Sequence, residues 1–363
     1  MPTNEPAPLL YACLATLLLS GSGAMPHATP HKTVSYEYTC AGNCDRPAGS
    51  LVTHGGALLA GGGDSPDDTF RWFSRQAAGG DILFLRASGS FDYPTFMYEL
   101  GECNSASMIY LFDRSAADDD FVVDQIEAAH GIFFAGGDQS NYHPGWEGTR
   151  LQSAVQAAID RGVPIGGTSA GLAIMGQFVF TAEVDGVTSA EALEDPYNRY
   201  MTLRGPFLRV PFLDGLVTDQ HWRQRDRLGR TLAFMGRLVQ DGMTGGQLRI
   251  RALCVDEDTS LMLDTQLGVG TVSGEGSWQG AYMLENTAPP LRVQPGQTLS
   301  YVNTTVHRIT SLQKGAAFDF RNWRPLLGPS ATWNVDAIDG VVSSSQGHPY
   351  GPPVLLAGGG ANL

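Results

Sequence analysis

The chain has 363 residues, which is long enough to bury a full hydrophobic core as one large domain or as two smaller ones. Hydrophobic residues make up 42% of it and charged residues 17%, a balance typical of a folded globular protein rather than a disordered one. The net charge of −14, from 37 acidic and 23 basic side chains, argues against nucleic acid as a partner, because phosphate binding requires a positively charged surface.

The N-terminal segment has the features of a processing signal. An apolar run covers residues 9–19, and small residues follow it at 20–24. The run is too short for a membrane span and has the length of a signal-peptide core, although Glu5 stands where a basic residue is usual. We therefore predict a signal peptide at residues 1–24 and a secreted protein without membrane contact after its removal. A cytoplasmic protein with an amphipathic or disordered leader is the alternative.

The cysteines agree with export. Removal of the leader, which contains Cys13, leaves Cys40, Cys44, Cys103 and Cys254. Cys40 and Cys44 can close a small loop and Cys103 and Cys254 a long-range bridge, but spacing alone does not choose among the three pairings. The spacing lacks a second close pair of zinc ligands, so no metal site is predicted.

Between residues 25 and 50 the chain is rich in proline, threonine and glycine, and an irregular extension is predicted there. Apolar stretches then alternate with amphipathic ones. Strands are predicted at 57–60, 81–85, 108–112, 131–135 and 163–165, and helices at 67–78, 121–129 and 150–161. This alternation predicts an α/β fold with a doubly wound, mostly parallel sheet covered by helices on both faces. After Cys254, short alternating segments predict further strands that extend or flank the same sheet.

Turns rich in glycine and serine follow several of these strands, at 61–63, 87–90, 136–139 and 167–171. The carboxyl ends of parallel strands share one edge of a sheet, so these turns should face one crevice. None of them matches a dinucleotide-binding or phosphate-binding pattern, and no cofactor is predicted.

The last of these turns has the pattern of a nucleophile elbow. Residues 167–171 read Gly-Thr-Ser-Ala-Gly between a predicted strand and a run that can form a helix. Such a turn presents the hydroxyl of Ser169 above the sheet, near the positive end of the following helix. The backbone amides of Gly137 and Ala170 are then candidates for an oxyanion hole.

A polar run at 218–230 supplies the candidate base. His221 lies where an apolar strand gives way to a predicted helix, and an imidazole can accept the serine proton and return it to a leaving amine. An acid is needed to orient the imidazole, and spacing selects none of the carboxylates between the two residues. These are Glu183, Asp185, Glu191, Glu194, Asp195 and Asp214.

Three blocks resemble the signature motifs of cyanophycinases. They are Gly136-Gly-Asp-Gln139, Gly167-Thr-Ser-Ala-Gly171 and Asp219-Gln-His-Trp-Arg-Gln-Arg-Asp-Arg-Leu-Gly-Arg230. The similarity runs from about Leu58 to Trp323 and includes Val255-Asp-Glu-Asp-Thr-Ser260. Cyanophycinases belong to a serine-peptidase family that includes the aspartyl dipeptidase peptidase E, and its fold is class I glutamine-amidotransferase-like.

The resemblance implies roles for single residues. Ser169 would be the nucleophile, His221 the base and Glu191 the acid, with Glu183 in reserve. The positions that match the family's substrate pocket are Gln139, Asp219, Gln220, Arg225 and Arg230. The two arginines would bind substrate carboxylates, and Asp219 and Gln139 would bind guanidinium groups.

At the level of the whole protein, the resemblance implies hydrolysis of cyanophycin, multi-L-arginyl-poly-L-aspartate, to β-Asp-Arg dipeptides without metal or organic cofactor. It places a peptidase domain at 51–325, before a loop-like tail at 326–363, and it is compatible with a homodimer. The alternatives are a peptidase or amidase acting on other acidic or isoaspartyl peptides, and a non-catalytic binding relative with the same fold.

Overall fold

The computed structural model describes residues 31–32, 35–274, 279–311, 316–327 and 330–351. The signal peptide predicted at residues 1–24 lies outside this part of the chain. Within the described residues, none of the helices combines the length and the apolar character needed to cross a membrane.

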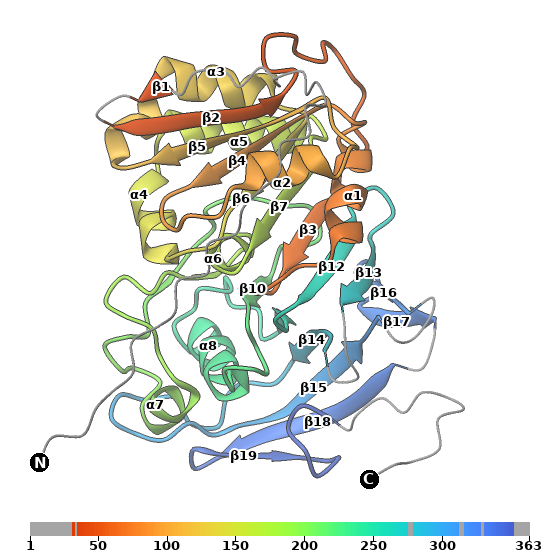
Figure 1. The fold of residues 1–363 in the computed structure, drawn as a ribbon. Helices are drawn as coiled ribbons and strands as arrows, with labels where there is room; N and C mark the ends of the chain where they lie inside the picture. The colour runs from red at the N-terminus through yellow and green to blue at the C-terminus, as the bar shows by residue number, and fades with distance from the viewer. Residues whose placement is uncertain (1–30, 33–34, 275–278, 312–315, 328–329, 352–363) are drawn as a thin grey trace, which may run out of the picture.

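An 11-stranded mixed sheet forms the larger half of the molecule (Figure 1). Its core is parallel and has the order β5-β4-β6-β7-β3, which are Ser105–Leu111, Asp81–Arg86, Gly131–Phe134, Ile165–Thr168 and Ala57–Ala60. The edge beyond β5 carries β2 (Tyr36–Gly42) and β1 (His31–Lys32). Beyond β3 lie β12 (Thr259–Asp264), β13 (Val269–Gly274), β16 (Ala317–Asp319) and β17 (Arg324–Leu327), all antiparallel. The predicted α/β class with a parallel core is confirmed.

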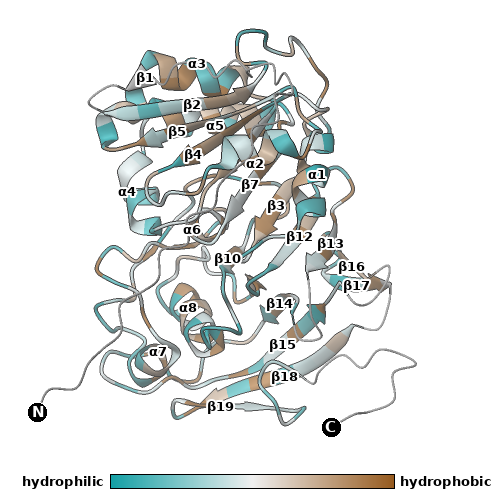
Figure 2. Ribbon diagram, in the orientation of Figure 1, coloured by the Kyte–Doolittle hydropathy of each residue, from teal (hydrophilic) through white to brown (hydrophobic). Residues whose placement is uncertain are grey.

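Successive residues of the core strands point to opposite faces, and each face has its own hydrophobic cluster. In β3, Leu58 packs with α1 (Asp67–Gln76) and α2 (Tyr93–Glu99) on one face. Its neighbour Leu59 packs with α3 (Asp120–Ala128) and α5 (Arg150–Asp160) on the other. Figure 2 shows the hydrophobic colour along β3 and β4 between these layers. This two-sided burial explains why the core strands are continuous apolar runs.

Short elements and capped helices complete this half. They are η1 (Arg114–Asp118), η2 (Gln139–Asn141), α4 (His143–Trp146) and α6 (Ala170–Ala173). The side chain of Asp119 accepts a hydrogen bond from the first turn of α3, and that of Thr149 does the same for α5. Such caps satisfy amides that a helix leaves unpaired at its N-terminus.

A second, six-stranded sheet has the order β10-β11-β14-β15-β18-β19. These strands are Leu216–Asp219, Ile250–Val255, Ala281–Asn286, Tyr301–Ile309, Ala331–Ile338 and Val341–Ser344. Only the β10–β11 pair is parallel. Helix α8 (Leu228–Gln240) packs on this sheet in a separate hydrophobic cluster, beside α7 (Ser189–Glu194) and the β8–β9 pair (Val179–Phe180 and Leu203–Arg204).

The structure differs from the sequence prediction at both ends of the domain. The stretch 25–50 was predicted to be irregular, but its residues 36–42 form a strand that pairs with β5. The tail 326–363 was predicted to be loop-like, but β18 and β19 form a hairpin within it. Of the predicted late strands, β12 and β13 extend the main sheet as expected, whereas in the second sheet β14 pairs with β11 and β15 pairs with β14. Alternating polarity predicts a strand but not its neighbours, and this explains the differences.

One of the disulfide bonds that the spacing left open is present. Cys40 and Cys44 are bonded across the end of β2, as the short spacing allowed. The possible bridge between Cys103 and Cys254 is not formed, because both are free thiols, with Cys254 buried inside β11.

Candidate active site

Ser169 lies at a sharp turn between β7 and α6. Its φ is 53°, a left-handed value that is uncommon for a residue with a side chain. The two flanking glycines make the turn possible. A Cβ on Gly167 would lie 2.5 Å from the backbone of Gly171, and one on Gly171 would lie 2.3 Å from the carbonyl oxygen of Phe134. The predicted strand–turn–helix around the serine is therefore present, with glycines where no side chain fits.

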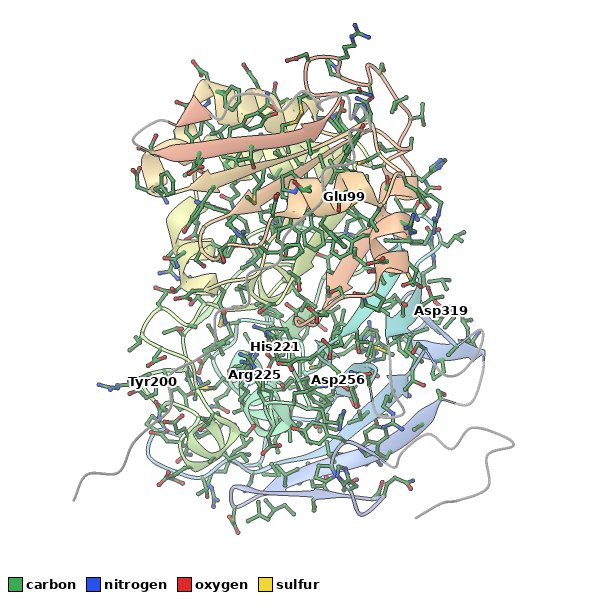
Figure 3. All side chains as sticks on the ribbon, in the orientation of Figure 1. Glu99, Tyr200, His221, Arg225, Asp256 and Asp319 are labelled. Atoms are coloured by element: carbon green, nitrogen blue, oxygen red, sulfur yellow. A yellow bond between two sulfur atoms is a disulfide. The ribbon has the colours of Figure 1, made fainter. Side chains whose placement is uncertain are left out.

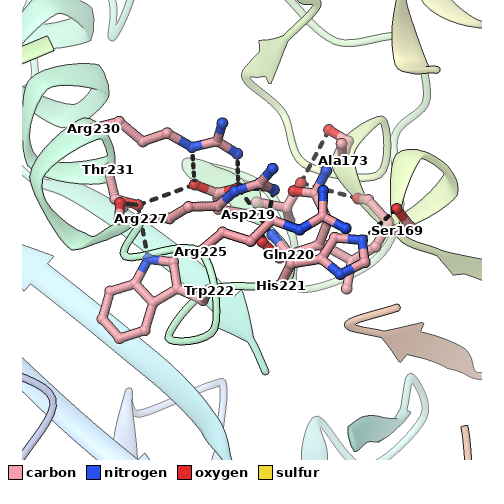
Figure 4. Close-up of polar contacts among 12 residues, drawn as sticks. Ser169, Ala173, Asp219, Gln220, His221, Trp222, Arg225, Arg227, Arg230 and Thr231 are labelled. Atoms are coloured by element: carbon pink, nitrogen blue, oxygen red, sulfur yellow. Dashed lines mark hydrogen bonds and ion pairs between the residues drawn. The ribbon is translucent and has the colours of Figure 1, made fainter. Parts of the chain in front are cut away.

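His221 follows the end of β10 and faces the serine. Its Nε2 is 2.7 Å from Ser169 Oγ, as Figure 4 shows, and its side chain is only 8% exposed. The backbone N–H of His221 donates to Gly61 O over 2.8 Å, which ties this turn to the end of β3. A Cβ on Gly62 would lie 2.1 Å from the imidazole Cε1, so the glycine turn after β3 leaves the space that the ring occupies.

Glu257 lies on the other side of the imidazole. Its Oε1 is 2.6 Å from His221 Nδ1. A carboxylate in this position accepts the Nδ1–H, so that Nε2 presents its lone pair to the serine hydroxyl. Glu257 stands in the turn between β11 and β12, and the pairing of β12 with β3 brings this turn beside Gly61 and His221.

The two glutamates predicted as the acid lie elsewhere. The carboxylate of Glu191 accepts hydrogen bonds from the backbone and hydroxyl of Thr188, at 2.9 and 2.8 Å, in a capping box at the start of α7. Glu183 forms an ion pair with Arg204 at 2.6 Å. The structure brings neither to His221, and Glu257 takes the place predicted for Glu191. The signal for Glu257 was the Asp-Glu-Asp run directly after an apolar strand, inside the block of residues 255–260 that resembles cyanophycinases.

The loop after β6 lies beside the serine. A Cβ on Gly136 would be 3.5 Å from the Cβ of Ser169, and Gly137 is the next residue. Ala170 is the first residue of α6, so its amide is one of those without a partner inside the helix. The amides predicted for an oxyanion hole thus belong to the two segments that flank the hydroxyl.

Asp219 and Arg230, predicted to bind substrate, form a buried ion pair instead. Each side chain is 3% exposed, and Arg230 Nε is 2.9 Å from Asp219 Oδ2 (Figure 4). The guanidinium carbon also lies 5.3 Å from the ring of Phe180 and 5.7 Å from that of Phe234. Because the two charges satisfy each other inside the second core, the predicted contacts of both residues with substrate are corrected to a structural role.

The other predicted pocket residues surround the site in different ways. Gln220 is 3% exposed, and in the described part of the chain its side-chain oxygen has no hydrogen-bond partner. Arg225 is 54% exposed, with Nε 3.4 Å from Glu257 Oε1. Gln139 begins η2, directly after the loop beside the serine. Arg225 and Gln139 therefore stay candidates for contact with a substrate.

Burial and charge adjust the histidine for proton transfer. Burial, followed by the nearby Arg225, lowers the pKa of His221 to about 4, and the hydrogen bond that the imidazole donates to Glu257 opposes this shift. The imidazole is then neutral at pH 7 and able to accept a proton. Burial also raises the pKa of the neighbouring Asp256 to about 6. Figure 3 shows His221, Arg225 and Asp256 together near the boundary between the two sheets. No cluster of three or more His, Cys, Asp or Glu side chains suited to a metal ion occurs among the described residues.

Comparison with known proteins gives sequence relatives over about half of the chain. A cyanophycinase from Geminocystis herdmanii is 25% identical over 187 residues, which are 50% of this chain and 61% of the relative. A cyanophycinase from Synechococcus elongatus is 29% identical over 166 residues, covering 46% of this chain and 45% of the relative. The match thus spans less than two thirds of either relative.

Solved structures give weaker likenesses. A peptidase from an acI-B1 actinobacterium has a TM-score of 0.47 at 14% identity, over 65% of this chain and 96% of that one. A protein described as peptidase E from Listeria monocytogenes has a TM-score of 0.38 at 12% identity, over 61% of this chain and 99% of that one. Activity therefore has to be argued from the site itself.

The family model named Peptidase family S51 matches residues 59–196. This region begins in β3, contains the loop after β6 and the serine turn, and ends just after α7. Over this region the chain is similar to peptidase family S51, and over about half of its length it is similar to the cyanophycinases.

Proposed function

We propose that the protein is a serine-type peptidase with Ser169 as nucleophile, His221 as base and Glu257 as the orienting acid. The observation that carries this proposal is the continuous chain of contacts from Ser169 Oγ to His221 Nε2, at 2.7 Å, and from Nδ1 to Glu257, at 2.6 Å. Nucleophile, base and acid within hydrogen-bond reach are what acyl transfer requires.

The reaction follows from the positions of the groups. His221 Nε2 takes the serine proton as Oγ bonds to the carbonyl carbon, and the carbonyl oxygen becomes an oxyanion near the amides of Gly137 and Ala170. Collapse breaks the C–N bond, and the imidazolium gives its proton to the leaving amine. Water then gives a proton to the same imidazole as its oxygen bonds to the acyl carbon, the bond between that carbon and Oγ breaks, and the imidazolium returns the proton to Ser169 Oγ. Glu257 stays ionised and holds the ring.

Cyanophycin is the substrate we propose first. The support is the kinship with proteins named cyanophycinase, together with the three sequence blocks around the loop after β6, the serine turn and His221. The expected products are β-Asp-Arg dipeptides, and exposed Arg225 is the residue best placed to meet a substrate carboxylate. Secretion and a homodimer remain predictions from the sequence.

A peptidase acting on other acidic or isoaspartyl peptides is the second candidate. It is favoured by the buried ion pair of Asp219 with Arg230, because these two residues, which were expected to bind cyanophycin, then bind each other.

Incubation of the purified protein with cyanophycin, followed by mass spectrometry of the products, tests the first proposal. Release of β-Asp-Arg by the wild type, and none by a folded Ser169→Ala variant, is the expected result. Hydrolysis of isoaspartyl dipeptides but not of cyanophycin would favour the second candidate. Equal activity of Ser169→Ala and the wild type would overturn both.

A further inference from the structure

A cavity of about 440 Å³ opens beside the serine turn. This volume lies within the range of small-ligand pockets. Its walls carry four aromatic rings and its mouth carries two carboxylates, from Phe70, Phe91, Tyr93, Phe96, Asp64 and Asp67. None of these six residues belongs to the Ser169–His221–Glu257 arrangement.

Two neighbours in sequence and one contact connect this cavity to the reacting groups. Thr168, which lines it, directly precedes Ser169. Gly63, which also lines it, follows the glycine that packs against the His221 ring. Burial raises the pKa of Tyr93, and a hydrogen bond between Tyr93 and the backbone of Gly136 opposes this rise. Gly136 lies beside Ser169. A side chain in the cavity would therefore belong to a residue close to the bond that Ser169 attacks.

The rings form a connected apolar surface. Phe91 lies edge-on to Tyr93 with centroids 4.7 Å apart, and to Phe96 at 5.7 Å, while Phe70 lies edge-on to Phe96 at 5.2 Å. Tyr93 and Phe70 are buried, but the Phe91 ring is 52% exposed. Edge-to-face packing is the arrangement that aromatic rings prefer, and an exposed ring at the mouth of an apolar cavity offers surface for a ligand to cover.

The charges at the mouth decide which side chains are tolerated. Asp64 and Asp67 are exposed, and neither forms an ion pair with any described residue. Arg86 is 3% exposed and lies behind the wall, where it donates to Phe91 O over 2.7 Å and lies 5.3 Å from the centre of the Tyr93 ring. A carboxylate entering the cavity would leave water and pass two like charges, so acidic side chains are rejected.

We propose that this cavity is a specificity subsite that takes a bulky side chain with an apolar body and no negative charge, next to the scissile bond, with Phe91 as its determining residue. Aromatic side chains, and arginine with its long aliphatic stem, share this chemistry. The inference rests on the proposed peptidase function and names the substrate class of the same site.

The test uses quenched-fluorescence peptides that differ at one residue on either side of a single cleavable bond, with Phe, Arg, citrulline, Ala or Glu at that residue. The wild type should cleave the Phe or the Arg peptide at least about tenfold faster, as kcat/KM, than the Ala and Glu peptides. Citrulline, the neutral analogue of arginine, separates recognition of the stem from recognition of the charge. Phe91→Ala should erase the preference, because kcat/KM for the Phe or the Arg peptide should fall to the level of the Ala peptide.

Two variants serve as controls. Phe112→Ala removes another partly exposed phenylalanine, at the end of β5, and should keep the wild-type preference. Asp64→Asn combined with Asp67→Asn should raise cleavage of the Glu peptide. Cleavage of all the peptides at similar rates, or an unchanged preference in Phe91→Ala, would overturn the subsite. Cleavage of no peptide, with no labelling of Ser169 by a fluorophosphonate, would instead count against the proposed function.

Discussion

Replacing Glu257 by glutamine tests the assignment of the orienting acid. The 2.6 Å contact between Glu257 and His221 Nδ1 selects the tautomer whose Nε2 faces the serine. A glutamine amide can donate to Nδ1, which moves the imidazole proton to Nε2 and leaves the serine facing a donor. The equivalent change in a Ser-His-Asp triad lowers kcat about ten-thousandfold, so Glu257→Gln should lose roughly three to four orders of magnitude. This is about 4–5.5 kcal/mol of transition-state stabilisation.

Glu191→Gln is the matched control, because it makes the same chemical change at the acid suggested by the resemblance. Glutamine can still close a capping box, so α7 and activity should be retained. Both variants are assayed for kcat on the same peptide and for thermal unfolding, with circular dichroism to confirm folding. An active Glu257→Gln beside an inactive, folded Glu191→Gln would refute the reasoning.

Three further outcomes are expected. Burial and Arg225 hold the pKa of His221 at about 4, so activity, measured as kcat/KM, should fall as the pH is lowered through about 4. Arg225→Gln removes a positive charge beside the imidazole, so the pKa of His221 should rise and this fall in activity should occur at higher pH. Arg230→Met leaves buried Asp219 with the longer ion pair to Arg227, at 3.5 Å, and without its main partner, and urea unfolding should show a loss of about 3 kcal/mol. Gly62→Ala places a methyl group against the His221 ring at a φ of +100°, which strains a residue with a side chain, so activity and the Tm should both fall.

Each of these three predictions has a control variant or a result that would contradict it. Gly186→Ala adds a methyl group where no atom lies within 4 Å and should stay active. An acid limb that does not move in Arg225→Gln would show that His221 is not the titrating base. Unchanged stability in Arg230→Met would show that the pair with Asp219 is not needed in the core, and full activity in Gly62→Ala would show that the ring can shift without loss.

Local pattern was enough to predict the serine turn and the histidine. Glycines around Ser169, apolar residues before it and a polar run containing His221 are properties of adjacent residues, and the structure has both elements where they were expected. The acid was missed because its position depends on strand order. Glu257 reaches His221 because β12 pairs antiparallel with β3. This pairing cannot be predicted from a short stretch of sequence.

The sequence of the polar run at 218–230 also did not show which of its arginines are buried. Arg225 and Arg230 look alike in sequence, yet one is 54% exposed beside Glu257 and the other is 3% exposed against Asp219. Helix α8 begins between them, so Arg230 turns toward the second core whereas Arg225 remains in the preceding turn. Electrostatic pairing could not be assigned before the helix start and its packing face were known.

The reacting groups come from both sheets. Ser169 stands at the end of a strand of the large sheet, His221 follows a strand of the small one, and Glu257 lies in the segment that passes from one to the other. Any opening between the two halves separates base from nucleophile, even if each hydrophobic cluster stays folded. Catalytic activity therefore requires the two halves to stay packed together. Activity should be lost at a lower denaturant concentration than the helical signal, as expected when subglobal opening precedes global unfolding.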